Sequence, residues 1–291
     1  MFDWDDLRLF LAAARARSLS GAAARLGVDA ATVGRRIARL ETATKSTLVV
    51  RSPQGLELTA AGTRLLRHAM AAEAAMNAAL DGVGDVASGI VRISVSEGFG
   101  TEIVAPALPE LRRLRPGLQV ELAANPGFLS PATREVDIAV TLSPPPDGRL
   151  LVEPLTDYRL ALYAAPAFLA RHGEPKSVAA LGGLDIVGYV EDLIYAPELR
   201  YLDEIGLTAR PALASSSIRA QRAIIAAGGG VGVLPCFLGE GLTRICRREV
   251  NLTRRFWIGA HRDIAETARI KAVRNWISRL VREKRNALLP G

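Results

Sequence analysis

The hydrophobic pattern of this chain changes its period near residue 89, and this change limits the kinds of domain that it can form. Before that point, apolar residues recur three and four positions apart, as Leu7, Phe10 and Leu11 do, which is typical of amphipathic helices. From Ile90 onward, short apolar runs alternate with helical patterns, which is typical of an α/β domain with largely parallel strands. A length of 291 residues suits two or three domains. We therefore expect a small helical domain followed by a larger α/β domain.

The N-terminal region contains the signals of three short helices and a hairpin. Ser, Asp and Gly residues stand where helix caps are needed, and two β-prone runs flank a Pro-Gln-Gly turn. The order helix, helix, turn, helix, hairpin is the outline of a winged helix-turn-helix. The expected elements are a helix over 5–17, a helix over 21–27 capped by Ser18 or Ser20, a helix capped by Asp29, and a hairpin over 47–59.

The stretch VDAATVGRRIARLE, residues 28–41, has two unlike faces on a helical wheel. One face is apolar, and the other is basic with small residues beside it. A basic face of this kind is either a solvated surface or a surface that enters a DNA groove. The capped helix before it and the hairpin after it favour the groove. The apolar face holds Val33, Ile37 and Leu40, and the basic face holds Thr32, Arg35, Arg36 and Arg39.

A long helix is expected to follow from Thr59. Its apolar residues alternate three and four apart, which suits packing against a partner helix as in a coiled coil. The alternative, packing on its own domain, is less favoured because the neighbouring segments are too short to cover it. Glycines then end the helix and mark a linker. The expected seam is Ala69, Ala72, Met76, Ala79 and Val83, and the glycines are Gly82, Gly84 and Gly89.

The C-terminal two thirds of the chain carries the α/β pattern. Apolar runs of strand length are separated by segments with helical periodicity. Strands are expected at 90–95, 118–124, 137–142, 158–165, 185–189, 231–235 and 255–261, and helices at 101–115, at 217–229 and from 267.

Charge and reactive residues narrow the classes of function. A net charge of +7 and a pI of about 9.9 favour a polyanionic partner. The three histidines belong to no motif with a nucleophile or with metal-ligand spacing, and the two cysteines are too few for a disulfide framework. The acidic N-terminus is unlike a signal peptide, and the longest uncharged run, 223–239, is broken by glycines and a proline. We therefore expect a cytoplasmic, non-enzymatic protein with no cofactor, metal or membrane span.

Residues 2 to about 67 resemble the DNA-binding domain of the bacterial LysR-type transcriptional regulators. The likeness lies in LRLFLAAARARSLSGAAARLGVDAATVGRRIARLE and LVVRSPQGLELTAAG, whose spacing fits without gaps, and the remainder resembles the family's effector domain. The resemblance implies an α+β multidomain protein in which a linker helix joins a winged helix-turn-helix to a periplasmic-binding-protein-like α/β domain. The implied divisions are 1–58 for DNA binding, 59–88 for the dimerising linker helix and 89–291 for effector binding, the last with subdomain I at about 89–160 and 266–291 and subdomain II at about 161–265.

The resemblance also implies which residues meet DNA, because the third helix enters the major groove in this family. A Gln is frequent where Ala30 stands and a Ser where Gly34 stands, so two polar readers are missing here. We expect Arg35 to read a guanine by bidentate hydrogen bonds and Thr32 to contact a thymine methyl group. Phosphate contacts are expected from the other arginines. The complete expected DNA-binding set is Ser20, Ala30, Ala31, Thr32, Gly34, Arg35, Arg36, Arg39 and Arg51.

An effector site is implied where two strands turn into helices, in the cleft between the subdomains. Many effectors of this family are small carboxylates, which suits free N–H groups and serine hydroxyls. Glu97 complicates this expectation, because a carboxylate in the turn would repel an anionic ligand unless it points away or pairs with an arginine. The alternative is that Glu97 caps the helix and faces solvent. Phe128 and Tyr189 are candidate cleft walls, with core packing as the alternative. The expected effector-binding set is Ser96, Glu97, Gly98, Phe99, Thr101, Phe128, Tyr189, Ser215, Ser216 and Ser217.

The family resemblance implies a homodimer paired through the linker helices and a homotetramer paired further through effector domains. Such an assembly places two helices on an inverted-repeat operator in double-stranded DNA, about one DNA turn apart. RNA polymerase is a further candidate partner. The alternative hypothesis is a small-molecule-binding α/β protein, or an enzyme, whose basic N-terminal helices serve only for oligomerisation.

Overall fold

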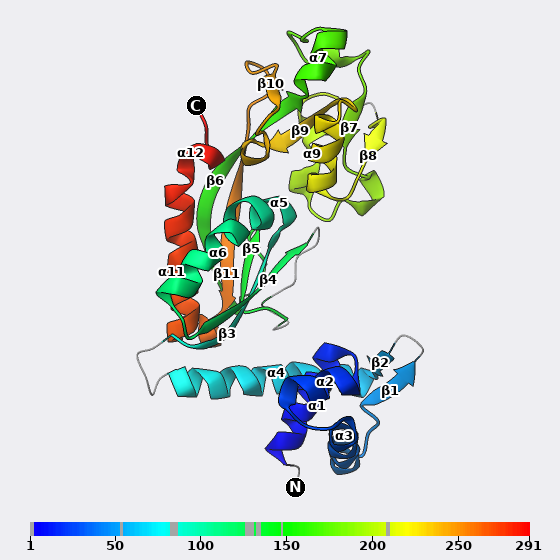
Figure 1. The fold of residues 1–291 in the computed structure, drawn as a ribbon, viewed down its shortest axis with the longest axis vertical. Coiled ribbons are helices and arrows are strands. Elements are labelled where there is room, and N and C mark those ends of the chain that lie inside the picture. The colour runs from blue at the N-terminus through cyan, green and yellow to red at the C-terminus, as the bar shows by residue number, and fades with distance from the viewer. Residues whose placement is uncertain are drawn as a thin grey trace. The chain divides into compact units, whose positions relative to one another are not determined.

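A computed structural model describes residues 3–52, 55–81, 87–125, 131, 135–146, 148–207 and 210–291 (Figure 1). The chain forms two compact units, Met1–Val83 and Gly84–Gly291, called here the N-terminal and C-terminal units. In the part of the chain described, no helix is both long enough and apolar enough to cross a membrane.

The N-terminal unit begins with three helices and a two-stranded wing, as the sequence predicts. Two of the helix starts carry side-chain caps from the predicted positions: Ser18 Oγ accepts from the Gly21 N–H at 3.2 Å, and Asp29 Oδ1 accepts from the Thr32 N–H at 2.7 Å. Ser18 is therefore the cap of the second helix, and Ser20 lies inside it. The elements are α1 (Trp4–Ala16), α2 (Leu19–Leu26), α3 (Ala30–Thr44), β1 (Val49–Ser52) and β2 (Gly55–Leu58).

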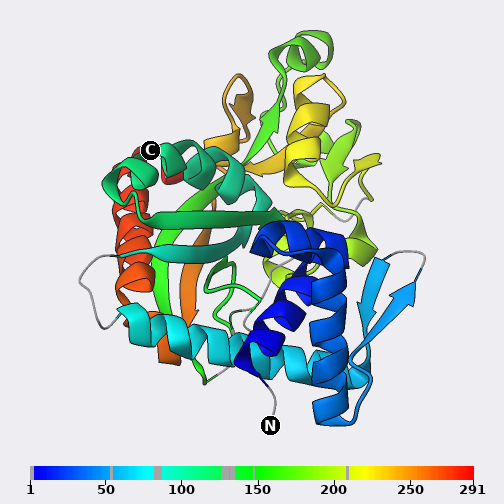
Figure 2. The same cartoon turned by 60° about the horizontal axis from the view of Figure 1, so that its bottom comes forward.

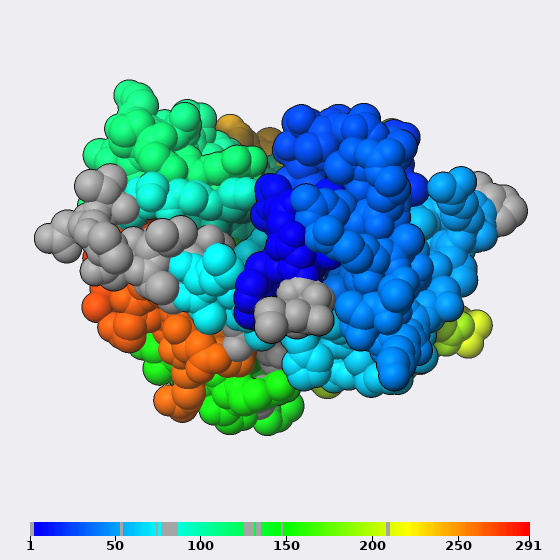
Figure 3. Space-filling view, turned by 90° about the horizontal axis from the view of Figure 1, so that it is seen from below, coloured from blue at the N-terminus to red at the C-terminus, as the bar shows by residue number. Residues whose placement is uncertain are grey.

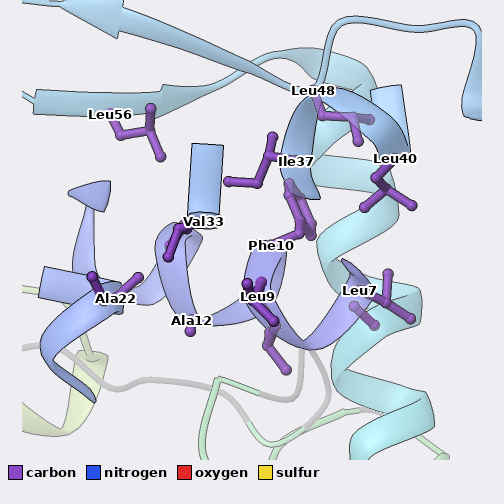
Figure 4. Close-up of a cluster of buried hydrophobic side chains, with 14 of the residues drawn as sticks. Leu7, Leu9, Phe10, Ala12, Ala22, Val33, Ile37, Leu40, Leu48 and Leu56 are labelled. Atoms are coloured by element: carbon purple, nitrogen blue, oxygen red, sulfur yellow. The ribbon is translucent and has the colours of Figure 1, made fainter. Parts of the chain in front are cut away.

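The apolar face predicted for α3 forms part of the core of this unit (Figure 4). Val33, Ile37 and Leu40 are each at most 2% exposed and pack with Phe10 of α1 and Leu48 at the base of the wing. Burial of this stripe fixes the rotation of α3 about its own axis, because turning the helix would bring apolar side chains into water. The opposite face is consequently the outward one.

The wing is attached at both of its ends by hydrogen bonds to the helices. The Glu41 carboxylate of α3 accepts from the Leu48 and Val49 N–H groups at 2.7 and 3.2 Å. At the other strand, the Leu56 N–H donates to the Arg17 carbonyl at 2.9 Å. These bonds satisfy backbone groups at the edge of the hairpin and hold the wing beside α3.

The long helix α4 (Ala60–Asp81) follows, with its first turn packed on the wing. Thr59 Oγ1 accepts from the Gly62 N–H at 3.0 Å, and a Cβ at Gly62 would overlap the Leu48 carbonyl oxygen. Ala69 is buried, whereas Met76 is 59% exposed. Of the remaining predicted seam and linker residues, Gly89 begins the next strand, while the Ala79 side chain, Gly82, Val83 and Gly84 lie outside what the structure describes.

The C-terminal unit is built on a nine-stranded sheet with the order β4-β3-β5-β11-β6-β9-β7-β8 and with β10 paired to β6. Its outer pairs are parallel, but β11 and β6 run antiparallel to each other and to their other neighbours. The prediction of largely parallel pairing is therefore wrong, because the sheet is mixed. β6 carries the chain from the β3–β5 side of the sheet to the β9 side, and β11 brings it back in the opposite direction. The strands are β3 (Gly89–Ser96), β4 (Leu118–Asn125), β5 (Ile138–Thr141), β6 (Leu150–Ala164), β7 (Ile186–Gly188), β8 (Leu213–Ala214), β9 (Val231–Pro235), β10 (Thr243–Ile245) and β11 (Leu252–His261).

The sheet divides into two lobes that share its two long strands (Figure 1). Lobe I holds β3, β4 and β5, and lobe II holds β7, β8, β9 and β10, while β6 and β11 run through both. The β6–β11 ladder is interrupted once, where Phe256 pairs with Thr156 but Trp257 pairs with Pro154, so that Leu155 is the extra residue of a bulge. Since each lobe contains part of both strands, the subdomain limits near residues 160 and 265 stay a proposal.

The helices of the C-terminal unit differ from the prediction in two ways: short helices at 166–172, 201–204, 262–265 and 285–288 were not predicted, and the helix expected over 101–115 is irregular. Instead of a regular helix over 101–115, helical structure begins at Glu97 and passes through α-, π- and 3-10-helical turns before α6. Pro106 and Pro109 lack the N–H groups that a continuous α-helix needs at these positions. The helices are α5 (Glu97–Phe99), a π-helical segment (Gly100–Val104), a 3-10 turn (Ala105–Ala107), α6 (Leu108–Leu114), α7 (Pro166–His172), α8 (Tyr201–Glu204), α9 (Ile218–Ala226), α10 (Arg262–Ala265), α11 (Ala268–Glu283) and α12 (Arg285–Leu288). Four further 3-10 turns are Ala179–Leu181, Glu191–Leu193, Pro197–Leu199 and Cys236–Leu238.

Candidate DNA interface and effector cavity

The outward face of α3 carries one arginine held by a short chain of hydrogen bonds. Arg35 is exposed, and its Nη2 donates to Thr32 Oγ1 at 2.8 Å. The Thr32 hydroxyl in turn donates to Asp29 Oδ2 at 2.7 Å, and the hydrogen bonds from Thr32 lower the pKa of Asp29. This chain restricts the Arg35 guanidinium and occupies the Thr32 hydroxyl, so the Thr32 methyl group is the part of that side chain left for an apolar contact.

The other two arginines of α3 are bound within the protein. Arg39 donates from Nε and Nη2 to the two carboxylate oxygens of Asp6, at 2.6 and 2.8 Å, and the Asp6 side chain is 1% exposed. Arg36 Nη1 lies 3.1 Å from Asp6 Oδ1 and 2.9 Å from Asp3 Oδ2. This network of ion pairs ties α3 to the first turn of α1. The predicted phosphate contacts of Arg36 and Arg39 would have to compete with it.

The remaining predicted DNA-binding residues lie around Arg35 or on the wing. Figures 2 and 3 show α3 and the wing next to each other on one exposed face of the N-terminal unit. Arg51 is exposed on β1, in register with Leu56 of β2. Ser20 and Ala31 are exposed, whereas Ala30 and Gly34 are half-buried. The sequence analysis did not identify Asp3 and Asp6, the aspartates at the start of α1 that bind Arg36 and Arg39. Their only sequence signal is the acidic run DWDD.

A mostly apolar groove runs between α1 and α4. Its volume is about 390 Å³, and Trp4 at its edge is 61% exposed. Three predicted seam residues, Ala69, Ala72 and Met76, line it. Glu73 borders the groove and forms a bidentate ion pair with Arg15, whose Nη2 and Nη1 donate to the two carboxylate oxygens at 2.6 and 2.9 Å. An exposed tryptophan and methionine beside small alanines form a surface suited to a partner helix.

The second candidate site is a small aromatic cavity between the lobes. Its volume is about 30 Å³, which is close to the space of a single water molecule in the liquid. Six of the predicted residues are among its walls, namely Ser96, Glu97, Gly98, Phe99, Tyr189 and Ser216. Thr101, Ser215 and Ser217 lie nearby but do not line it, and Phe128 is outside the described residues. The walls that the sequence analysis missed are Leu142, Tyr158, Tyr195, Leu199, Tyr201, Ile218, Pro235, Phe237 and Phe256.

Glu97 joins the two lobes at this cavity. Its Oε1 accepts from Ser217 Oγ at 2.9 Å, and the same Ser217 oxygen caps α9 by accepting from the Ala220 N–H at 3.1 Å. The second oxygen, Oε2, is buried and has no hydrogen-bond partner. Glu97 is therefore not the solvent-facing cap of its helix. Ser215 Oγ accepts from the Ser217 N–H at 3.1 Å, so both of these serines organise the start of α9.

The tyrosines of the cavity are uncharged at neutral pH. Burial raises the pKa of Tyr195 to about 12, and the neighbouring Glu97 carboxylate adds to the shift. Burial also raises the pKa of Tyr158, Tyr189 and Tyr201. Tyr158 stacks on Phe256 with ring centroids 4.2 Å apart. The cavity thus offers neutral rings, neutral hydroxyl groups and one carboxylate.

Within the ranges that the structure describes, no group of three or more His, Cys, Asp or Glu side chains is placed to hold a metal ion. Both cysteines are free thiols, and Cys246 is buried.

The fold and these surfaces define a class of two-unit proteins in which a winged helix-turn-helix precedes a two-lobed α/β unit with a cavity between its lobes. Residues 84–282 match the family model described as "LysR substrate binding domain", and residues 4–63 match "Bacterial regulatory helix-turn-helix protein, lysR family". The chain belongs to the LysR family. The family resemblance and fold class inferred from the sequence are thereby confirmed.

Relatives and solved structures agree with this assignment. The chain is 32% identical over 184 residues to the HTH-type transcriptional regulator DmlR of Escherichia coli K12, a match that covers 62% of this chain and 60% of DmlR. The chain thus spans about 60% of the length of that relative. The structure of CrgA, a LysR-type transcriptional regulator from Neisseria meningitidis, is 25% identical with a TM-score of 0.60, over 97% of this chain and 99% of CrgA. Full-length OxyR from Pseudomonas aeruginosa shares the fold, with a TM-score of 0.70 at 17% identity over 97% and 98% of the two chains.

Proposed function

We propose that this protein is a DNA-binding transcriptional regulator whose activity responds to a small molecule bound in its C-terminal unit. The observation that carries the proposal is the outward face of α3, where Arg35 is restrained by Thr32 and Asp29 beside an exposed wing. A restrained guanidinium loses less side-chain entropy when it binds and presents two parallel donors to a guanine edge. Membership of the LysR family supports the same role.

In this proposal the predicted DNA-binding residues make three kinds of contact: with bases, with phosphates, and by close approach of the backbone. Arg35 reads a base and the Thr32 methyl group meets a thymine. Arg51 on the wing holds a phosphate. Small residues let the backbone of α3 and α2 approach the DNA closely, and these are Ser20, Ala30, Ala31 and Gly34. Arg36 and Arg39 set the position of α3 through their ion pairs, and they add only long-range attraction for the phosphates.

The assembly proposed is a dimer in which the groove between α1 and α4 takes α4 of a second copy, with pairing of effector domains giving a tetramer. The groove is lined by three residues of the predicted seam, of which Met76 is exposed, and by the exposed Trp4 of α1, which supports a helix of the same chain as the occupant. Two copies would place α3 helices on an inverted-repeat operator. We further propose that the protein works in the cytoplasm, has no enzymatic activity and acts on transcription with RNA polymerase as a partner.

The test is a binding titration of the full chain on sites selected from random double-stranded DNA, and on scrambled versions of these sites. Arg35→Ala should weaken binding to the selected site and leave scrambled DNA bound almost as before, whereas Arg51→Ala should weaken both alike. Equal losses on both DNAs for Arg35→Ala would refute its role as a reader. An absence of salt-dependent DNA binding by the unmodified chain would refute the regulator and favour the alternative, in which the helices serve only for oligomerisation.

A further inference from the structure

The aromatic cavity contains an uncompensated acidic group. Glu97 Oε2 is buried and unpartnered, while Oε1 is held by Ser217. Buried carboxylate oxygens normally have hydrogen-bond or ionic partners, because leaving one without a partner forfeits its hydration. Since Ser217 fixes the orientation of the carboxylate from lobe II, Oε2 cannot turn away to find another donor without losing that bond. Oε2 therefore lacks a hydrogen-bond donor, and none of the described residues supplies one.

No cation among the described residues lines this cavity, whose walls contain no Lys, Arg or His. The nearby Arg219 is engaged outside it, in an ion pair with Glu102 and at 3.5 Å from Thr101 Oγ1. The charge of Arg254 acts on the wall tyrosines Tyr158 and Tyr201, but Arg254 does not line the cavity and is paired with Glu204. A ligand carboxylate placed here would therefore face the Glu97 carboxylate with no cationic side chain in the wall to offset the repulsion. This composition disfavours the small carboxylate that the family resemblance suggests.

The rest of the wall suits a positive charge. Tyr158, Tyr189, Tyr195 and Tyr201 contribute neutral phenol rings, and the phenylalanines contribute further ring surfaces. The faces of such rings attract ammonium groups, and this attraction is largest where water is excluded. An ammonium group has three N–H donors, which one carboxylate alone does not saturate, and the phenol oxygens can accept the remaining hydrogen bonds. The volume of about 30 Å³ admits a compact head group and leaves any longer chain to extend out of the cavity.

We propose that the effector of this protein is an organic cation whose ammonium head group enters the cavity, pairs with Glu97 Oε2 and lies against the tyrosine rings. This inference rests on the proposed function, since it names the chemical class of the effector for that same site. Glu97 belongs to lobe I and Ser217 to lobe II, so a cation bound at Glu97 would act where the two lobes meet. Binding would thus bias the arrangement of the lobes through contacts that only the closed cavity provides.

The test compares three probes that differ in head group, n-butylammonium chloride, butan-1-ol and sodium butyrate, by calorimetric titration of the full chain at constant ionic strength. The ammonium should bind, and the alcohol and the carboxylate should bind at least tenfold more weakly. Glu97→Gln, which keeps the shape of the side chain, should reduce the affinity for the ammonium at least tenfold. Tyr195→Leu, which removes a wall ring that is 37% exposed, should reduce it severalfold. The matched control Glu240→Gln changes an exposed glutamate that does not line the cavity, and it should leave the affinity unchanged.

Several outcomes would overturn the proposal. These are tighter binding of butyrate than of the ammonium, equal ammonium affinity of the unmodified chain and Glu97→Gln, or no binding by any member of a series from methylammonium to n-hexylammonium. DNA binding, measured on the same preparations, separates this failure from failure of the proposed function. A chain that binds selected DNA sites but no ammonium refutes the effector class alone, whereas a chain that binds no DNA refutes the regulator.

Discussion

Arg39→Ala distinguishes a structural arginine from a phosphate-binding one on the same face of α3. In the structure Arg39 donates two hydrogen bonds to Asp6 and one to Asp3, at 2.6 to 2.8 Å. Truncation leaves the buried Asp6 carboxylate with Arg36 alone, at 3.1 Å. A charge-assisted hydrogen bond contributes about 1.5–3 kcal/mol, and loss of one partner of a buried pair costs about 3–5 kcal/mol.

These magnitudes must be reduced here, because the Arg39 side chain is 54% exposed and water can approach its side of the pair. We expect Arg39→Ala to lower the melting temperature of the N-terminal unit by roughly 10 °C, because the buried Asp6 carboxylate loses its bidentate partner. Arg39→Lys keeps the charge but loses the bidentate geometry of the guanidinium, so its fall in melting temperature should be smaller than that of Arg39→Ala.

The assay is thermal unfolding followed by circular dichroism, alongside DNA titration well below the melting temperature of each variant. Arg35→Ala is the matched control, since Arg35 lies on the same helix but makes only the single hydrogen bond to Thr32. It should leave stability within about 0.5 kcal/mol and weaken DNA binding. The reasoning would be refuted if Arg39→Ala left the melting temperature unchanged and weakened DNA binding as much as Arg51→Ala does.

Four further predictions concern single sites. Gly34→Ala should stabilise α3 by up to about 1 kcal/mol in urea unfolding, because its new Cβ would lie 3.7 Å from a Leu19 methyl group, an ordinary contact. Gly62→Ala should cost about 2 kcal/mol in the same assay, because its Cβ would overlap a backbone oxygen of the wing. Met76→Glu should weaken self-association in sedimentation equilibrium without lowering the melting temperature of the monomer, because this side chain is 59% exposed. Asp29 has a lowered pKa in the folded state, so its contribution is present above about pH 4 and is lost as the pH falls further. Asp29→Asn, which can still cap α3, should make stability depend less on pH between 5 and 3, and an unchanged pH profile would contradict this account.

What the sequence could predict is mainly what depends on local spacing. The buried stripe of α3 follows from positions 33, 37 and 40, and the caps at Ser18 and Asp29 follow from residue type and from the helices that they precede. A helix periodicity and a cap each involve neighbours within one turn, so no knowledge of the rest of the fold is needed.

The contacts that determine the geometry of the DNA interface and of the aromatic cavity join residues far apart in the chain. Arg39 and Asp6 are 33 positions apart, and whether they meet depends on how α3 crosses α1. Glu97 and Ser217 are 120 positions apart, and whether Glu97 faces solvent or the cavity depends on how the lobes pack. The irregular helix after Glu97 was missed for another reason: its apolar spacing resembles that of a regular helix, and only its prolines indicate that hydrogen bonding changes along it.

The bulge at Leu155 has a mechanical consequence for the C-terminal unit. Among the described strands, β6 and β11 are the two that pass between the lobes, and they form one hydrogen-bonded ribbon. Such a ribbon resists stretching and sliding, because both would break the ladder, and the register shift beside Pro154 is where the ladder is already disrupted and its twist is increased. Relative movement of the lobes would then be a rotation about the ribbon axis, so a ligand at the lobe contact would exert a torque on this axis and leave the distance between the lobe centres almost constant.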